Sequence, residues 1–321
     1  MSVRAVCLAA LAALAVGCGD GGGVDKNHPP NVTVLYVTPE NPEPYSLANL
    51  TYSALDVDGD PIRLSWSASA GKIVFGEELE AIWQTPEEGW HQIALTASDG
   101  VSSVTKSIDV LVWEPRKGNF YPLAVGNLWT YLDQDGNEVT IEIIDKIEVE
   151  NADRFSYVME TRTTDPNVEE NVSNYAYVGR VEDGIEQHGL NVIFGSSDTL
   201  LFDPWLPLYR FPLIPGKEWS QKFTAYLPDG IPVGSGTASY RVIEEAEIET
   251  PAGAFQHAIL VEEDFKWTLG GFEIDHTVSR KWLAPDVGII RIEQTQTRGE
   301  QTEERRVQLI DYDLLPDTSM E

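Results

Sequence analysis

Four aspartates are the side chains in this sequence best placed to do chemistry. Asp56, Asp58 and Asp60 alternate within the segment DVDGDP, and Asp99 stands in a later Asp-Gly turn. Carboxylate oxygens are ligands that Ca²⁺ prefers, so these residues form a candidate calcium site. An EF-hand is excluded, because that loop needs glycine sixth and glutamate twelfth, whereas here glycine is fourth and Ser67 is twelfth. Asp and Gly also favour tight turns without a metal, and turn chemistry is the preferred interpretation.

Other catalytic and metal-binding patterns are missing from the sequence. His188, His257 and His276 are not paired at the spacing of metal ligands, and there is no HExxH motif. Gly234-Ser-Gly236 lacks the spacing of a nucleophile elbow, and Ala70-Gly-Lys72 lacks the first glycine and the hydroxyl residue of a P-loop. With 52 acidic residues, some carboxylate pair at hydrolase spacing is inevitable and carries no signal. We therefore expect a protein that is not an enzyme.

Net charge and cysteine content restrict the partners and cofactors. The charge is −30 over 321 residues, and such a surface repels polyanions, so nucleic acid is not an expected partner. The two cysteines are Cys7 and Cys18. If Cys7 leaves with a leader peptide, the single remaining thiol allows no internal disulfide and no thiolate metal site. We expect no cofactor apart from the candidate Ca²⁺, and the sequence does not indicate an oligomeric state.

The N-terminal residues have the pattern of an export signal. Arg4 supplies a positive charge, and 5–16 is an unbroken apolar run followed by Gly17 and Cys18. A helix of that length reaches about 18 Å, less than the ~30 Å of hydrocarbon that a transmembrane segment crosses. The pattern predicts a signal peptide over 1–17. An ordinary signal peptide with a chance cysteine is the alternative to the interpretation that follows.

The cysteine after Gly17 resembles the lipobox of bacterial lipoproteins. The resemblance implies cleavage before Cys18, acylation of its thiol and attachment to a membrane through the lipid. Gly19, not Asp, follows the cysteine, which by the same resemblance implies the outer membrane. Residues 18–30 are glycine-rich and end in a proline pair, so they predict a flexible tether with a reach of about 20 Å.

Residues 31–113 predict a seven-stranded, immunoglobulin-like β-sandwich. Alternating apolar residues recur in short runs, such as Ile62-Leu64-Trp66 and Ile108-Val110-Val112, with turn signals between them. The region resembles the PKD and cadherin-like modules of bacterial surface proteins. That resemblance implies extracytoplasmic spacing, adhesion or glycan contact, and a buried Trp66. The segments that carry it are Asn27–Asn31, Leu50–Ala54, Asp56–Pro61, Leu64–Trp66, Trp83–Pro86 and Thr96–Gly100.

A second all-β domain is predicted over 119–313, after a boundary at 114–118 and before a tail at 314–321. Strand alternation continues and no apolar stripe of helical period occurs, so we expect a curved antiparallel sheet forming a half-barrel or open barrel. The motif YPLAVGNLW at 121–129 echoes FPLIPGKEW at 211–219. Together with Thr250–Phe255 and Trp282–Gly288, these motifs resemble an uncharacterised β domain of secreted bacterial lipoproteins, distantly similar to the half-barrels of lipoprotein carriers.

The stretch 200–211 is rich in prolines and aromatic residues and reads as too irregular for a strand. Two interpretations remain open. It is a lid over the mouth of a half-barrel that binds a hydrophobic ligand, or it is a loop that plugs the barrel, which is preferred. The aromatic residues concerned are Phe202, Trp205, Tyr209 and Phe211.

Three functions follow in order of preference. The first is a lipid-anchored protein of the cell envelope that acts as a non-enzymatic binding or structural module and contacts glycan or protein. The second is a carrier or sensor of a hydrophobic ligand held in the C-terminal domain. A hydrolase that uses paired carboxylates is the least favoured.

Overall fold

The computed structural model describes residues 27–76, 80–149, 154–164, 172–193 and 197–316. Every regular element within these ranges is a strand, which confirms the all-β class. No helix in this part of the chain is long and apolar enough to cross a membrane. The signal peptide, Cys18 and the tether up to Lys26 lie outside the described residues. The chain divides into two compact units between Glu114 and Pro115.

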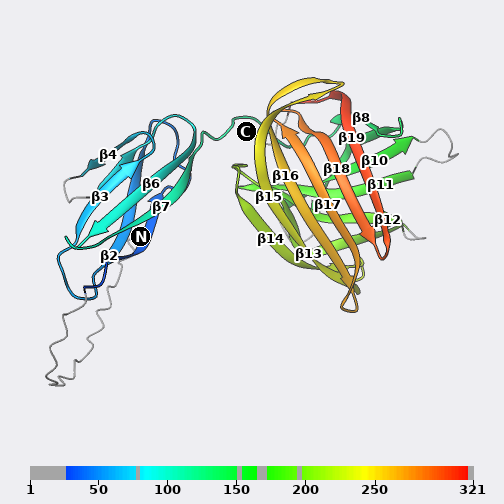
Figure 1. Ribbon diagram of the computed structural model, residues 1–321. Coiled ribbons are helices and arrows are strands. Elements are labelled where there is room, and N and C mark those ends of the chain that lie inside the picture. Colours follow the sequence, from blue (N-terminus) through cyan, green and yellow to red (C-terminus); the bar gives the residue numbers. More distant parts are fainter. Residues whose placement is uncertain (1–26, 77–79, 150–153, 165–171, 194–196, 317–321) are drawn as a thin grey trace. The chain divides into compact units, whose positions relative to one another are not determined.

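The first unit consists of two antiparallel sheets, drawn in blue to cyan in Figure 1. One has four strands in the order β1-β2-β5-β4, and the other has three in the order β3-β6-β7. The strand bounds are β1 Asn31–Thr38, β2 Leu47–Leu55, β3 Arg63–Ala68, β4 Lys72–Phe75, β5 Ala81–Gln84, β6 Gly89–Ser98 and β7 Ser103–Val112.

The core of the first unit contains side chains from both sheets. Trp83 of β5 and Ile93 of β6 are fully buried in one cluster, because alternate residues of a strand face the same side. The indole of Trp83 donates a hydrogen bond to the carbonyl of Ala70 at 3.0 Å. Trp66 is half-buried, not buried as expected, and packs edge-to-face on Tyr52 with 5.5 Å between ring centres.

The second unit is a closed barrel of twelve antiparallel strands (Figure 1). This finding corrects the expected half-barrel or open barrel. Closure pairs the two sheet edges, whose backbone N–H and C=O groups an open sheet would leave unsatisfied. The strand bounds are β8 Leu128–Asp133, β9 Glu138–Val149, β10 Arg154–Thr164, β11 Val172–Val181, β12 Gly184–Ile193, β13 Ser197–Arg210, β14 Glu218–Tyr226, β15 Pro232–Thr250, β16 Gly253–Leu269, β17 Phe272–Ala284, β18 Gly288–Arg298 and β19 Gln301–Asp313.

The two echoing motifs begin two equivalent halves of the barrel, β8–β13 and β14–β19. The amide of Gly126 donates to the carbonyl of Ile143, and the amide of Gly216 donates to the carbonyl of Val242, both at 2.8 Å. The amide of Ile143 in turn donates to the carbonyl of Asn127. The amide of Val242 likewise donates to the carbonyl of Lys217, and both distances are 2.9 Å. Both glycines have positive φ, 98° and 89°, a conformation that side chains disfavour. The repeat in the sequence is therefore also a repeat of backbone conformation and hydrogen bonding.

The segment that begins the first repeat packs against inward-facing side chains of the barrel. Tyr121 and Leu123 are buried, and the hydroxyl of Tyr121 donates to the sulfur of Met159 at 3.4 Å. The ring of Tyr121 also lies 5.3 Å from that of Tyr209. The residues that fill this end of the barrel thus precede β8, whereas the sequence placed a plug at 200–211.

Candidate functional site

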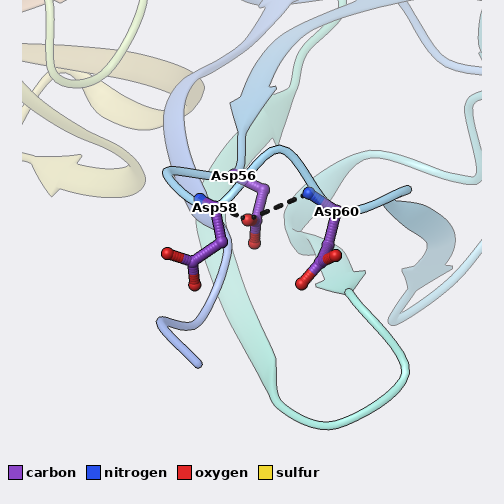
Figure 2. Close-up of side chains that lie close together, drawn as sticks. All are labelled: Asp56, Asp58 and Asp60. Carbon is purple, nitrogen blue, oxygen red and sulfur yellow. Dashed lines mark hydrogen bonds between the residues drawn. The ribbon is translucent and has the colours of Figure 1, made fainter. Parts of the chain in front are cut away.

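The three aspartates of the first motif gather on the turn between β2 and β3, as Figure 2 shows. One carboxylate oxygen of each lies within 4.8 Å of the others. Asp56 organises the turn, because its Oδ1 accepts the amides of Asp58 at 2.9 Å and Asp60 at 3.3 Å. Its Oδ2 is buried and has no hydrogen-bond partner among the described residues. This aspartate triad has oxygen ligands of the type that Ca²⁺ takes.

Asp99, the fourth predicted ligand, is not part of the triad. Its Oδ1 accepts the amides of Ser102 at 2.6 Å and Val101 at 2.7 Å, and its Oδ2 accepts the side-chain amide of Asn27 at 3.0 Å. These hydrogen bonds, led by that of Ser102, hold the pKa of Asp99 below its usual range. The carboxylate closes its own turn and fastens the N-terminal approach to β1.

His28 is a residue that the sequence reasoning missed. Its amide donates to Oδ2 of Asp58 at 2.6 Å, and its ring Nδ1 lies 2.9 Å from Oδ1 of the same carboxylate. The hydrogen bonds from His28 lower the pKa of Asp58. A cation at the triad would compete with this imidazole for Asp58. The only signal in the sequence is that His28 precedes a proline pair at the entrance to β1.

The four aromatic residues of the predicted lid do not form a lid. Phe202 and Tyr209 are buried residues of the barrel wall, in β13. The ring of Trp205 packs on that of His188 of β12 at a tilt of 36°, with 4.0 Å between ring centres. Phe211 begins the second repeat. The stretch forms a strand despite its prolines, because β12 pairs with it from Ser197 to Arg210.

The three histidines of the barrel lie apart, each with a different partner. His188 contacts Ser156, His257 contacts Glu245, and Nε2 of His276 lies 3.1 Å from Asp264. Among the residues that the structure describes, only the aspartate triad brings three side chains of metal-binding type together.

The barrel interior is aromatic on one side and contains an ion pair. The ring of Phe223 lies 5.2 Å from Phe202 and 5.3 Å from Phe265. Nζ of Lys281 lies 2.6 Å from Oε2 of Glu263. Glu263 faces inward, because it is the register partner of the buried Tyr240.

Hollows of three sizes occur among the described residues of the barrel. An apolar cavity of about 50 Å³ is lined by Tyr121, Pro122, Trp129, Tyr131, Ile141, Met159, Gly288 and Ile289. A hollow of about 420 Å³ is lined by Glu218, Trp219, Ser220, Ser239, Tyr240, Arg241, Glu262 and Asp264. A third, of about 490 Å³, is lined by Arg116, Gly118, Phe120, Glu182, Asp183, Phe211, Pro212 and Leu213.

Comparisons with known proteins do not assign a family. No family model and no curated protein matches the chain. Two solved structures share 14% identity with it. One is described as an exported protein with a YmcC-like fold, from Bacteroides fragilis, with a TM-score of 0.39 over 61% of this chain and 100% of that one. The other is described as a lipoprotein, from Parabacteroides distasonis, with a TM-score of 0.34 over 62% and 100%. At these TM-scores neither similarity assigns a fold or an activity.

Proposed function

We propose that the protein is a lipid-anchored, non-enzymatic binding or structural module of the cell envelope, attached through Cys18 to the outer membrane. The observation that supports the proposal is that the last residues of the predicted tether are bonded to the first unit. Asn27 is bonded to Asp99 and Ser102, at 3.0 and 3.1 Å, and His28 is bonded to Asp58. These contacts hold the first unit to the chain that enters it, as a module suspended from an anchor requires.

We infer that the first unit is an immunoglobulin-like sandwich of the PKD type. Its sheets, β1-β2-β5-β4 and β3-β6-β7, have the strand order of a constant-type immunoglobulin domain, ABED and CFG. Trp90 is 64% exposed and offers a ring on which a sugar can stack. Glycan-array binding of the mature protein tests this contact, with Trp90→Ala as the variant that should lose it.

Labelling with palmitate in cells tests the anchor. Wild-type protein should incorporate the label and sediment with membranes, whereas Cys18→Ser should remain unprocessed or be released. Cys7→Ser is the matched control, because the lipobox resemblance assigns no acylation to Cys7. Palmitate that persists on the Cys18→Ser protein would contradict the anchor.

A second candidate function is carriage of a hydrophobic ligand in the barrel. The aromatic interior around Phe223 favours it, since apolar and aromatic walls are typical of small-molecule sites. The apolar cavity beside Tyr121 measures only about 50 Å³, so a ligand would have to displace core side chains. Lipid extraction of the purified protein tests this function. A bound lipid would support carriage, and a protein that neither retains lipid nor takes up an apolar dye would exclude it.

A further inference from the structure

The two halves of the barrel meet at two junctions, and these junctions differ. At the first, β19 pairs with β8 at six register positions, from Val307 with Asp133 to Asp313 with Leu128. At the second, β13 pairs with β14 at three positions only, from Leu201 with Tyr226 to Asp203 with Thr224. The residues after these in β13, 204–210, and before them in β14, 218–223, are described and have no such register partners across this junction. We call this stretch the seam.

Prolines in β13 explain why the pairing stops. Pro204 and Pro207 lie in the seam, whereas β19 contains no proline. The carbonyl of Pro207 points towards β14, because the indole of Trp219 donates to it at 2.6 Å. In an extended strand the amide of a residue faces the same side as its carbonyl. Pro207 has no N–H to offer on the side that faces β14, so the backbone ladder between the two strands cannot continue there.

Side chains join the two strands where the backbone does not. The indole of Trp219 bonds to Pro207 in place of a main-chain amide. Nζ of Lys217 donates to the carbonyls of Arg210, Phe211 and Pro212 at 2.9, 3.3 and 3.1 Å. Burial lowers the pKa of Lys217, which is the effect of enclosing an ammonium group. Trp219 therefore holds the seam itself, whereas Lys217 fastens the connection 211–217 between the two strands. Both side chains can change rotamer without unfolding a strand.

The seam has an aromatic interior on one side, and a charged hollow lies over its β14 edge and the next two strands, β15 and β16. Trp219 stacks on Tyr240 at 5.4 Å and an angle of 12°. At the paired end of the seam, Phe202 packs on Phe223. The hollow of about 420 Å³ includes Glu218, Trp219 and Ser220 of β14 in its lining. Its size is within the range of small-molecule sites.

We propose that the seam between β13 and β14 is a lateral opening of the barrel wall, held shut by Trp219. The ligand class that fits it is an amphiphile, with an apolar body for the aromatic interior and a polar end for the hollow. Arg241 and Glu262 in the lining of the hollow form an ion pair of 3.0 Å, with which a polar end would interact. The inference rests on the carrier function proposed above, and it adds the route of entry and the residue that controls it.

Hydrogen exchange of the full chain, followed by mass spectrometry, tests the opening itself. The amides of 205–210 and 218–223 that face the seam, and not those that face β12 or β15, should exchange at least about tenfold faster than the amides between β19 and β8, because local opening governs exchange. Equal protection at the two junctions would overturn the proposal. This comparison needs no variant and makes no assumption about a ligand.

Locking the two junctions separately tests the route. Leu201 and Tyr226 are register partners in the paired stretch next to the seam, and Leu132 and Gln308 are register partners at the other junction. Directly opposed residues are close enough for a disulfide. The pair Leu201→Cys and Tyr226→Cys should slow uptake of the neutral dye N-phenylnaphthylamine severalfold, with recovery in reductant. The control pair Leu132→Cys and Gln308→Cys should leave the rate unchanged. Equal effects of both locks would overturn the route.

The role of Trp219 in holding the seam shut is tested by a mild substitution there and by the same substitution at Trp129, the equivalent residue of the first repeat. Trp219→Phe keeps the ring but removes the bond to Pro207, so dye uptake should become faster. Trp129→Phe removes the equivalent indole, which donates to the carbonyl of Val287 at 2.7 Å, and should not change the rate. Faster uptake in both variants would overturn the role of Trp219. If amides at the seam exchange fast but neither the wild type nor any variant takes up dye, the result would support the opening and overturn the carrier function.

Discussion

Asp58 is held by the backbone amide of His28 at 2.6 Å and by its ring Nδ1, which lies 2.9 Å from one carboxylate oxygen and 3.2 Å from the other. The pair joins the end of the predicted tether to the aspartate triad. A change in the charge of Asp58 therefore affects the segment at His28 by which the chain enters the first unit. We call this segment the entrance. It lies between the proposed anchor and the candidate cation site.

Acid should weaken this entrance. Hydrogen bonds from His28 place the pKa of Asp58 below its ordinary value of 3.8, so its ionised form stabilises the fold above that pH. The contribution is lost as the pH falls through the lowered pKa. The difference in melting temperature between wild type and Asp58→Asn should shrink as the pH falls through the lowered pKa of Asp58. A difference that does not shrink in acid would contradict this role of Asp58.

Calcium should raise the melting temperature if the triad binds it. Binding to the native state alone stabilises by about 2.7 kcal/mol at a free concentration one hundred times the dissociation constant. Asp56→Asn should abolish the shift, because Asp56 belongs to the triad, whereas Asp99→Asn should retain it. Thermal denaturation with added Ca²⁺ and with chelator measures both, and identical curves for wild type would eliminate the site.

Truncation of the core tryptophan should destabilise the first unit strongly. Trp83 is fully buried, so Trp83→Ala removes its packing, leaves a cavity, and should cost about 3–5 kcal/mol. Trp90→Ala is the control, because that side chain is 64% exposed and should change stability by less than about 0.5 kcal/mol. Chemical denaturation monitors both variants, and equal losses would show that burial is not the cause.

The repeat turns should require glycine at both equivalent positions. Gly126 and Gly216 have positive φ, so alanine at either should cost about 1–2 kcal/mol. Gly76→Ala serves as the control, since Gly76 has no strained φ and an added Cβ would meet only ordinary contacts, the nearest at 3.6 Å. Urea unfolding compares the three variants, and a neutral Gly216→Ala would refute the equivalence of the two turns.

The candidate site was partly predictable. The spacing of Asp56, Asp58 and Asp60 predicted that they could meet, because a tight turn brings alternate residues to one side. The separation of Asp99 was not predictable, since its oxygens are taken by Ser102 and Asn27. His28 was missed because its partner is 30 residues away and no local pattern links them.

The same division holds for the fold. Alternation of apolar residues has a period of two, so the sequence by itself determined an all-β protein and most of its strands. The sequence also determined the repeat, because the two motifs can be recognised by comparing their residues. Closure of the barrel was decided only by tertiary structure, since it depends on pairings such as β19 with β8 that join residues far apart in the chain.

The prolines of β13 show the physical reason most clearly. Read locally, Pro204 and Pro207 argue against a strand, because each lacks an N–H. In the structure β12 supplies a ladder on one side of β13, while Trp219 occupies the side on which Pro207 cannot donate. The sequence determined that one side of this strand would be short of backbone hydrogen bonds. Only the tertiary structure decided that the unpaired side would face another strand and leave a seam in a closed wall.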